Sequence, residues 1–165
     1  MPIQAAQNQE VLTFTVRGGN RALWESRDKE IVAEGPSGTG KTRTILELVH
    51  RSCLKYEGLR CLIVRKYGAT LTTTCLVTYR EKVLRSQDGV SFFGGSKDKP
   101  AAFTYPNGSS IVVGGMDDPD KVLSAEYDLI YWNEATEGSE EAWETLLTRL
   151  RNGVMPYQQL IADCN

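Results

Sequence analysis

One segment of eight residues constrains this chain more than any other feature of its sequence. The segment reads Gly35, Pro36, Ser37, Gly38, Thr39, Gly40, Lys41 and Thr42. It has the pattern GxxxxGK[ST] and lies between a strand predicted over 30–34 and a stretch with helical spacing. Such glycines let backbone N–H groups turn inward around phosphates, and the next helix directs its positive dipole end at them. The segment therefore predicts a nucleotide-binding loop, with an ordinary glycine turn as the alternative.

The last two residues of this loop carry its chemistry. We expect Lys41 to reach the β- and γ-phosphates of a nucleotide and to take part in catalysis. We expect Thr42 to offer its hydroxyl to Mg²⁺. The predicted cofactors are therefore ATP and Mg²⁺.

The remaining pattern indicates an α/β fold. Four short apolar runs are typical of strands buried on both faces. They are Ile31–Ala33, Cys61–Val64, Leu129–Trp132 and Leu160–Ala162. Because amphipathic stretches separate these runs, we expect a mainly parallel sheet with helices on both faces.

Three stretches have helical spacing. The first places Ile45, Leu48, Val49 and Cys53 on one side, and Glu47 largely on the other. The second is expected to be one helix from Leu71 to Leu84. The third begins at Ser139, a predicted N-cap, and has two glutamates in its first turn.

Residues 102–114 depart from this alternation. The turn signal Tyr105-Pro106-Asn107-Gly108 lies between two runs of strand-forming residues. We expect a β-hairpin insertion here.

Composition excludes several classes of protein. The chain has 165 residues, 41% hydrophobic and 24% charged, which is typical of one globular domain. No apolar run approaches the roughly 20 residues of a transmembrane helix, so we expect no membrane partner and a cytosolic location. A net charge of -2 gives no global attraction to nucleic acid. The polar residues 1–9 are expected to be frayed.

Histidine and cysteine usage argues against zinc sites. The only histidine is His50, for which we expect a structural role in a helix. The four cysteines include no CxxC pair, so we expect buried thiols.

A second candidate site follows the strand at Leu129–Trp132. Glu134 is our candidate general base, which would orient and deprotonate the attacking water. The preceding residue normally helps to hold Mg²⁺, but here it is Asn133, so we expect weak or water-mediated metal contact. Asp128 cannot replace it, because five strand residues place it about 16 Å away. The alternative is that Glu134 only begins a solvated loop.

A third candidate site, Arg65-Lys66-Tyr67, follows the strand predicted over 60–64, and several threonines come after it. Arg65 and Lys66 could contact a phosphodiester backbone. A solvated loop with a helix cap explains the same residues, and the sequence leaves both open.

Five segments carry a family likeness: GPSGTGKT, CLIVRKYGATLTTTCLVTY, PNGSSI, GGMDDPDKVLSAEYDLIYWNEA and LLTRLRNGVMPYQQLIADCN. They resemble the large terminase subunit of tailed bacteriophages, in its N-terminal ATPase part only. The resemblance implies a P-loop NTPase of the RecA/ASCE type, with an extra strand over 157–163 between the strands of the two nucleotide motifs. It also implies a motor that couples ATP hydrolysis to DNA translocation into a capsid.

The resemblance assigns further residues. Asn165 falls where that family has its coupling residue, and Arg65 and Lys66 fall in a DNA-associated motif. Arg17 is weakly similar in position to the residues that bind adenine. Lys121 or Arg149 is implied as the cation that a neighbouring subunit supplies.

The implied partners are double-stranded DNA, a homo-oligomeric ring, the portal and the small terminase subunit, in the cytoplasm of the infected bacterial host. Residues 1–165 are expected to form an ATPase domain that is incomplete at its C-terminus and lacks the nuclease domain, so we expect no DNA cleavage. Two alternatives remain: a nucleotide-binding fragment that does not hydrolyse ATP, or another DNA-stimulated P-loop ATPase such as a helicase or a recombinase-like protein.

Overall fold

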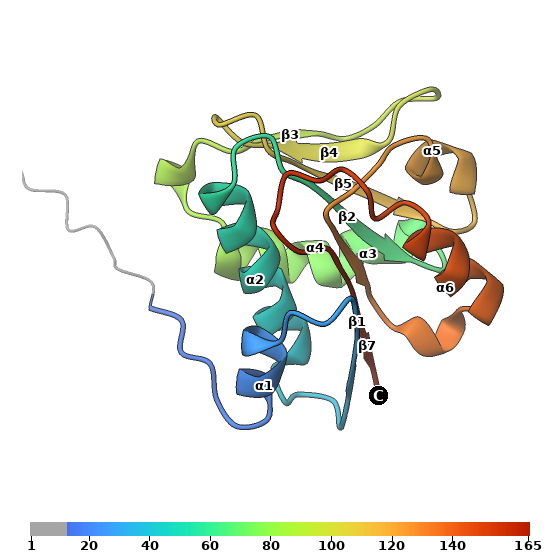
Figure 1. Cartoon of the computed structure of the whole chain (residues 1–165). Coiled ribbons are helices and arrows are strands. Elements are labelled where there is room, and N and C mark those ends of the chain that lie inside the picture. The colour runs from blue at the N-terminus through green and yellow to red at the C-terminus, as the bar shows by residue number, and fades with distance from the viewer. Residues whose placement is uncertain (1–12) are drawn as a thin grey trace, which may run out of the picture.

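A computed structural model describes residues 13–165, and the segment expected to be frayed, 1–9, lies outside them. One sheet of seven strands runs through this part of the chain (Figure 1). In chain order the strands are β1 (Glu30–Glu34), β2 (Arg60–Arg65), β3 (Ser91–Phe93), β4 (Ala101–Thr104), β5 (Ser110–Gly115), β6 (Leu129–Trp132) and β7 (Gln159–Cys164). The α/β class predicted from the sequence is confirmed.

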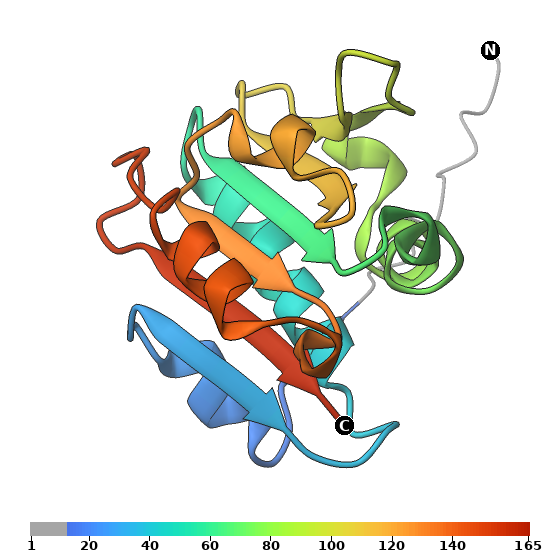
Figure 2. The ribbon, with the colours of Figure 1, turned by 90° about the vertical axis from the view of Figure 1, so that its right-hand side faces the viewer.

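The strand order in space is β1-β7-β6-β2-β5-β4-β3. The first five strands of this order are parallel, and β4 and β3 continue the sheet antiparallel. The extra strand expected between the two nucleotide motifs is therefore β7, which pairs with β1 on one side and β6 on the other. Because these strands are parallel, their carboxyl ends meet at one edge of the sheet (Figure 2).

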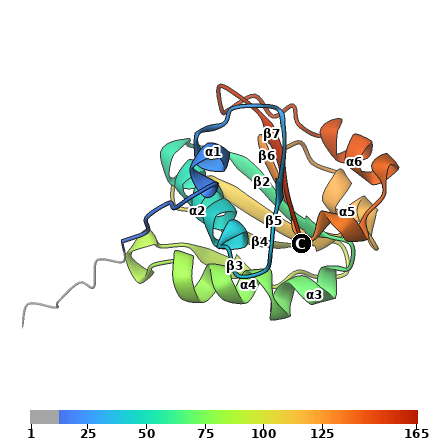
Figure 3. The same cartoon turned by 90° about the horizontal axis from the view of Figure 1, so that it is seen from below.

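Helices cover both faces of the sheet (Figure 3). One face packs against α1 (Asn20–Glu25), α2 (Lys41–Lys55), α3 (Gly68–Thr73), α4 (Cys75–Thr78) and the π-helical η1 (Tyr79–Val83). The other face packs against α5 (Pro119–Leu123) and α6 (Glu140–Leu147). Two short 3-10 segments, η2 (Ser86–Asp88) and η3 (Ala135–Glu137), complete the described elements. None of the helices in residues 13–165 is long and apolar enough to cross a membrane.

The predicted hairpin is formed by β4 and β5. Its turn is closed by hydrogen bonds from the Tyr105 N–H to the Ser109 carbonyl (2.9 Å) and from the Gly108 N–H to the Tyr105 carbonyl (3.0 Å). The hairpin is more than an insertion, since β5 also pairs in parallel with β2 inside the main sheet. A third antiparallel strand, β3, was not expected.

The single helix expected from Leu71 to Leu84 is wrong. The backbone breaks at Thr74 (φ -126°, ψ -89°), which separates α3 from α4, and a π-helical turn follows. Threonine hydroxyls bond to nearby carbonyls throughout α3, for example from Thr74 Oγ1 to the Thr70 carbonyl (2.7 Å). Such bonds compete with the regular helical ladder, and a sequence stripe of apolar residues does not reveal them.

Two burial expectations also fail. β1 is not buried on both faces, because Val32 is 60% exposed on the outermost strand. Glu47, expected largely on the solvated side of its helix, is only 1% exposed. Arg43 accounts for its burial, since Nη2 of the guanidinium donates to Glu47 Oε1 at 2.6 Å. The helix stripe at Ser139 is confirmed, and the Ser139 hydroxyl caps α6 by accepting from the Ala142 N–H.

His50 has the structural role expected from the sequence. It is buried in α2, where its Nδ1 lies 2.7 Å from the Tyr105 hydroxyl and its Nε2 lies 3.1 Å from Asp88 Oδ2. Three of the four cysteines are buried as expected, and burial raises the thiol pKa of Cys61 and of Cys75. Cys164 is only partly buried.

We predict that His50 makes stability depend on pH. Burial lowers its pKa below 6.5, against the opposing effect of Asp88 and Glu47. The unfolded chain therefore binds the proton more readily, so the free energy of unfolding falls as pH drops from about 7 toward 5. His50→Gln keeps a polar group beside Tyr105 but does not titrate. Its unfolding free energy in urea should fall less over this range than that of the wild type; an equal fall would contradict the prediction.

Candidate active site

The loop from Gly35 to Thr42 connects β1 to the N-terminus of α2, which is the strand–loop–helix setting that the pattern requires. Gly38 and Gly40 have left-handed backbones, with φ of 80° and 82°. Residues with a Cβ rarely adopt this conformation, so these two glycines allow the loop to curl over the helix N-terminus. The loop thus presents backbone N–H groups and a helix dipole to one point in space.

Lys41 folds its side chain over this loop. The residue is only 8% exposed, and its ammonium donates to the carbonyls of Gly35 (2.5 Å) and Pro36 (2.9 Å). It also donates to Asn165 Oδ1 at 3.3 Å. The cation is therefore held at the mouth of the loop, within reach of the tip of β7.

Glu134, the candidate general base, follows β6 in an unusual conformation. It has φ 55° and ψ 58°, and among residues 13–165 it is the only non-glycine with positive φ. Its N–H donates to Asp163 Oδ1 at 2.8 Å. A left-handed backbone costs a residue with a Cβ about 1–2 kcal/mol, and residues that bear such strain cluster at functional sites.

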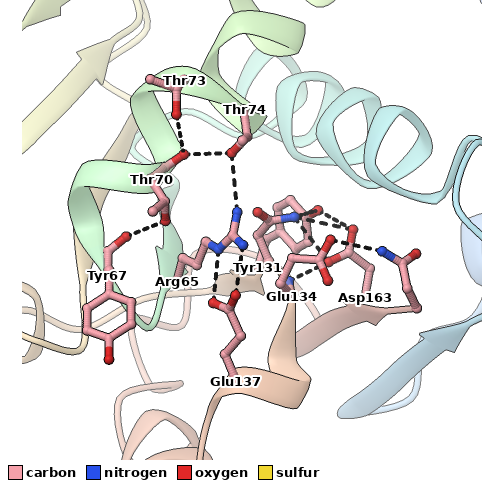
Figure 4. A network of polar contacts seen from close by, with 11 residues as sticks. Arg65, Tyr67, Thr70, Thr73, Thr74, Tyr131, Glu134, Glu137 and Asp163 are labelled. Atoms are coloured by element: carbon pink, nitrogen blue, oxygen red, sulfur yellow. Dashed lines mark hydrogen bonds and ion pairs between the residues drawn. The ribbon is translucent and has the colours of Figure 1, made fainter.

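Asn165 connects the two predicted motifs. Its amide nitrogen donates to Glu134 Oε1 at 3.1 Å, and its amide oxygen accepts from Lys41 (Figure 4). The residue expected to couple the site therefore contacts both the loop lysine and the candidate base.

Asp163 is the residue that the sequence analysis missed. It lies at the end of β7, is 3% exposed, and accepts hydrogen bonds from Thr42 Oγ1 and from the Tyr131 hydroxyl, both at 2.7 Å. It also accepts from the Asn133 amide at 3.2 Å. A carboxylate at the end of an otherwise apolar run was the available signal, but only the strand order reveals what it touches.

The site suits Mg²⁺. Thr42 offers a hydroxyl, and the carboxylates of Glu134 and Asp163 lie on the two adjacent strand ends. Asn133 is 4% exposed and its Oδ1 has no hydrogen-bond partner within the described part of the chain, so this buried acceptor could receive a hydrogen bond from a metal-bound water. No three His, Cys, Asp or Glu side chains gather as a metal cage among residues 13–165. Mg²⁺ in nucleotide sites uses one or two carboxylates with the phosphates, so a cage is not required.

Arg65 and Lys66 follow β2 at the same edge. The Arg65 guanidinium donates to Glu137 through Nε (3.1 Å) and Nη2 (2.9 Å), and this pairing raises the pKa of Arg65 and lowers that of Glu137 (Figure 4). Its Nη1 lies 3.5 Å from the Thr74 hydroxyl. Lys66 lies over the ring of Tyr67, 5.3 Å from its centroid. Arg65 is therefore already engaged within the protein.

Arg17 lines a cleft of about 850 Å³ beside the loop, together with Gly35 and Lys41. Asn20 ties this region to the loop by donating to the Thr39 carbonyl at 2.9 Å. The cleft has room for a nucleoside next to the phosphate loop, which agrees with the position suggested for Arg17.

Lys121 and Arg149, the candidate trans cations, lie in different places. Lys121 is on α5, which follows the carboxyl end of β5, and it pairs with Asp118 at 3.1 Å. The Arg149 carbonyl accepts from the Tyr127 N–H at 2.8 Å, before the amino end of β6. Asp128 is also at that opposite end, fully buried, as its rejection as a metal ligand requires.

The glycine loop, the acidic strand end and the intervening strand β7 together define a P-loop ATPase fold of the RecA/ASCE type. The profile of the phage terminase large subunit family matches residues 27–165. The chain therefore belongs to the phage terminase large subunit family. No curated protein matches it significantly in sequence.

Solved structures support the same fold. The ATPase domain of the large terminase from Thermus phage P74-26 is similar with a TM-score of 0.70 and 16% identity, over 92% of this chain and 66% of that one. A full-length large terminase from another thermophilic bacteriophage is similar with a TM-score of 0.68 and 14% identity, over 86% of this chain and 35% of that one. A structure of this second terminase in complex with ADP has a TM-score of 0.64 at 15% identity, over 84% of this chain and 34% of that one. The present chain thus spans about a third of the length of the second terminase.

We predict that the backbone at Glu134 is held left-handed by its surroundings. Glu134→Gly and Glu134→Ala remove the same carboxylate, but only glycine accepts positive φ without cost. The glycine variant should therefore be more stable than the alanine variant by about 1 kcal/mol, measured by thermal or urea unfolding.

The same pair of substitutions at Glu144, an exposed residue within α6, is the control. There alanine should be more stable than glycine by about 1 kcal/mol, because the backbone is helical. If alanine is also the more stable residue at position 134, the conformation described for Glu134 is wrong.

Proposed function

We propose that this chain binds ATP with Mg²⁺ and hydrolyses it, as the ATPase part of a motor that drives double-stranded DNA into a viral capsid. The observation that carries the proposal is the hydrogen-bonded chain Lys41–Asn165–Glu134, which joins the phosphate loop, the tip of β7 and the candidate base. Family membership supports it, as does the similar fold of a terminase described in complex with ADP.

In this proposal the loop amides and Lys41 bind the phosphates and neutralise charge that develops on them. Glu134 orients a water molecule toward the γ-phosphorus and accepts its proton as the new P–O bond forms and the bond to the leaving ADP breaks. Asn165 senses the state of the site, because it contacts both Lys41 and Glu134. Arg17 contributes to the nucleoside cleft.

Thr42 would hold Mg²⁺ through its hydroxyl, and Asn133 would act through a bound water. The ion supplies charge neutralisation at the β- and γ-phosphates when bound. The hydroxyl of Thr42 is already oriented, since its proton is donated to Asp163.

The proposed partners follow from the family. They are double-stranded DNA, other copies of the subunit in a ring, the portal and the small terminase subunit, in the host cytoplasm. Residues 1–165 would belong to the ATPase part of the subunit, without nuclease residues. Lys121 is the better placed trans cation, because its helix follows a strand end at the edge of the sheet that carries the loop.

We predict that Glu134→Gln binds nucleotide but loses turnover. Glutamine keeps the size and a hydrogen-bonding oxygen for Asn165, yet it cannot accept a proton from water. The rate of ATP hydrolysis should fall by about 100-fold or more, while the Kd for a fluorescent ADP analogue stays within a few-fold. Lys41→Ala should lose both binding and turnover.

Glu144→Gln on the outer surface of α6 is the matched control and should hydrolyse ATP at the wild-type rate. Turnover should also rise with protein concentration if a neighbouring copy supplies a cation. Full turnover in Glu134→Gln would remove that residue as the base. Binding without turnover in the wild type would favour the alternative of an inert nucleotide-binding fragment.

We also predict opposite effects on DNA binding when the ion pair of Arg65 is changed from each side. Glu137→Ala frees the guanidinium and should strengthen binding to double-stranded DNA, whereas Arg65→Ala should weaken it, each by about 2- to 10-fold, with a shallower salt dependence for Arg65→Ala. Fluorescence anisotropy at several salt concentrations measures both. Arg151→Ala, which breaks an exposed pair with Glu126, is the control. Unchanged affinity in both variants would favour the solvated-loop alternative.

A further inference from the structure

The first position after β6 poses a problem for a magnesium site. Asn133 is neutral there, although Mg²⁺ in such sites is held by carboxylate together with phosphate oxygens. Glu134, the next residue, is the proposed base and cannot also give its charge to the metal without losing basicity. A second carboxylate is needed close to Thr42.

Asp163 lies where that carboxylate is required. Its strand β7 separates β1 from β6, and Asp163 pairs in register with Ala33, two residues before the phosphate loop. Asp163 Oδ2 accepts the proton of the Thr42 hydroxyl at 2.7 Å. A hydroxyl that donates its single proton keeps its lone pairs available, so Asp163 directs the oxygen of Thr42 toward a cation.

The contacts of Asn133 show what it does instead. A carboxylate only accepts hydrogen bonds, so the Asn133 amide must turn its NH₂ group toward Asp163, at 3.2 Å from Oδ1 and 3.4 Å from Oδ2. The Asn133 oxygen then faces away and is the buried acceptor without a partner in the described part of the chain. Asn133 therefore positions Asp163, and its own amide is not the charge that a metal needs.

Asp163 also lacks a counter-ion within residues 13–165. Its neighbours are neutral donors, namely the Tyr131 hydroxyl at 2.7 Å and the Glu134 N–H at 2.8 Å besides Thr42 and Asn133. None of the ion pairs among these described residues includes Asp163, although it is 3% exposed. A buried carboxylate without a cation favours the entry of one.

We propose that Asp163, on the strand next to the phosphate loop, is the carboxylate that binds Mg²⁺ with Thr42 in this chain, in place of the neutral Asn133. The inference rests on the proposed function, since the ion arrives with the nucleotide. Asn133 keeps a role as the positioning residue of Asp163.

The test is the metal dependence of nucleotide binding. The affinity for a fluorescent ADP analogue is measured with Mg²⁺ and with EDTA, and Mn²⁺ bound in the presence of ADP is counted by electron paramagnetic resonance. Asp163→Asn should need about 10- to 100-fold more metal for the same gain in affinity, while the affinity in EDTA stays within a few-fold.

A swapped variant separates charge from packing. Asn133→Asp combined with Asp163→Asn keeps one aspartate and one asparagine in contact, and it should recover most of the metal dependence. If Asp163→Asn does not fold, the swapped variant decides alone. Loss of metal dependence in a folded swapped variant would assign Asp163 a structural role and overturn the proposal.

Asp128→Asn is the matched control, because Asp128 is a buried aspartate at the opposite end of the same sheet, held by the N–H groups of Arg60 and Val154. It should lower thermal stability and leave the metal dependence unchanged. Unaltered metal dependence in Asp163→Asn would overturn this inference alone. A wild-type chain that binds no nucleotide in either buffer would overturn the proposed function as well.

Discussion

The position of β7 between β1 and β6 is the constraint on which the site depends. It separates the phosphate loop from Glu134 by two strand spacings, about 10 Å in total. A loop lysine and a strand-end glutamate at that separation need connecting side chains, and the tip of β7 provides them. Asp163 bonds to Thr42 on one side and to the Glu134 N–H on the other, while Asn165 reaches Lys41 and the Glu134 carboxylate. The geometry of the base is therefore set by a strand that carries neither nucleotide motif.

A second connection leads away from the site. Arg65 follows β2, and it reaches across to Glu137, three residues after Glu134, and to Thr74 at the break between α3 and α4. The short elements after β2 have irregular backbones because threonine hydroxyls compete for the helical carbonyls. A change at Glu134 can thus be passed to Glu137 and Arg65, and from there to the segment for which the sequence suggested contact with DNA. The same ion pair that connects these elements also withholds the guanidinium from solvent.

Sequence patterns predicted what depends on neighbours along the chain. The phosphate loop, the N-cap at Ser139 and the β4–β5 hairpin each follow from a few adjacent residues. The failures involve partners distant in sequence or bonds that apolar spacing does not show. Glu47 is buried because Arg43 neutralises it, Val32 is exposed because of its place in the strand order, and the helix expected over 71–84 is broken by side chain to backbone bonds. Asp163 belongs with these, since its role follows only from which strands lie beside β7.

The pairing of Asn133 with Asp163 shows why the residue after β6 is a poor guide to the metal site on its own. A cation responds to charge at a point in space, and adjacent parallel strands bring their ends to nearly the same point. A carboxylate can therefore stand on either strand end, provided that the other residue donates to it and does not repel it. Asn133 meets that condition, because its NH₂ group faces the carboxylate, whereas a second aspartate there would place two like charges in a buried contact. The neutral residue at position 133 and the acidic residue at position 163 are thus two halves of one arrangement.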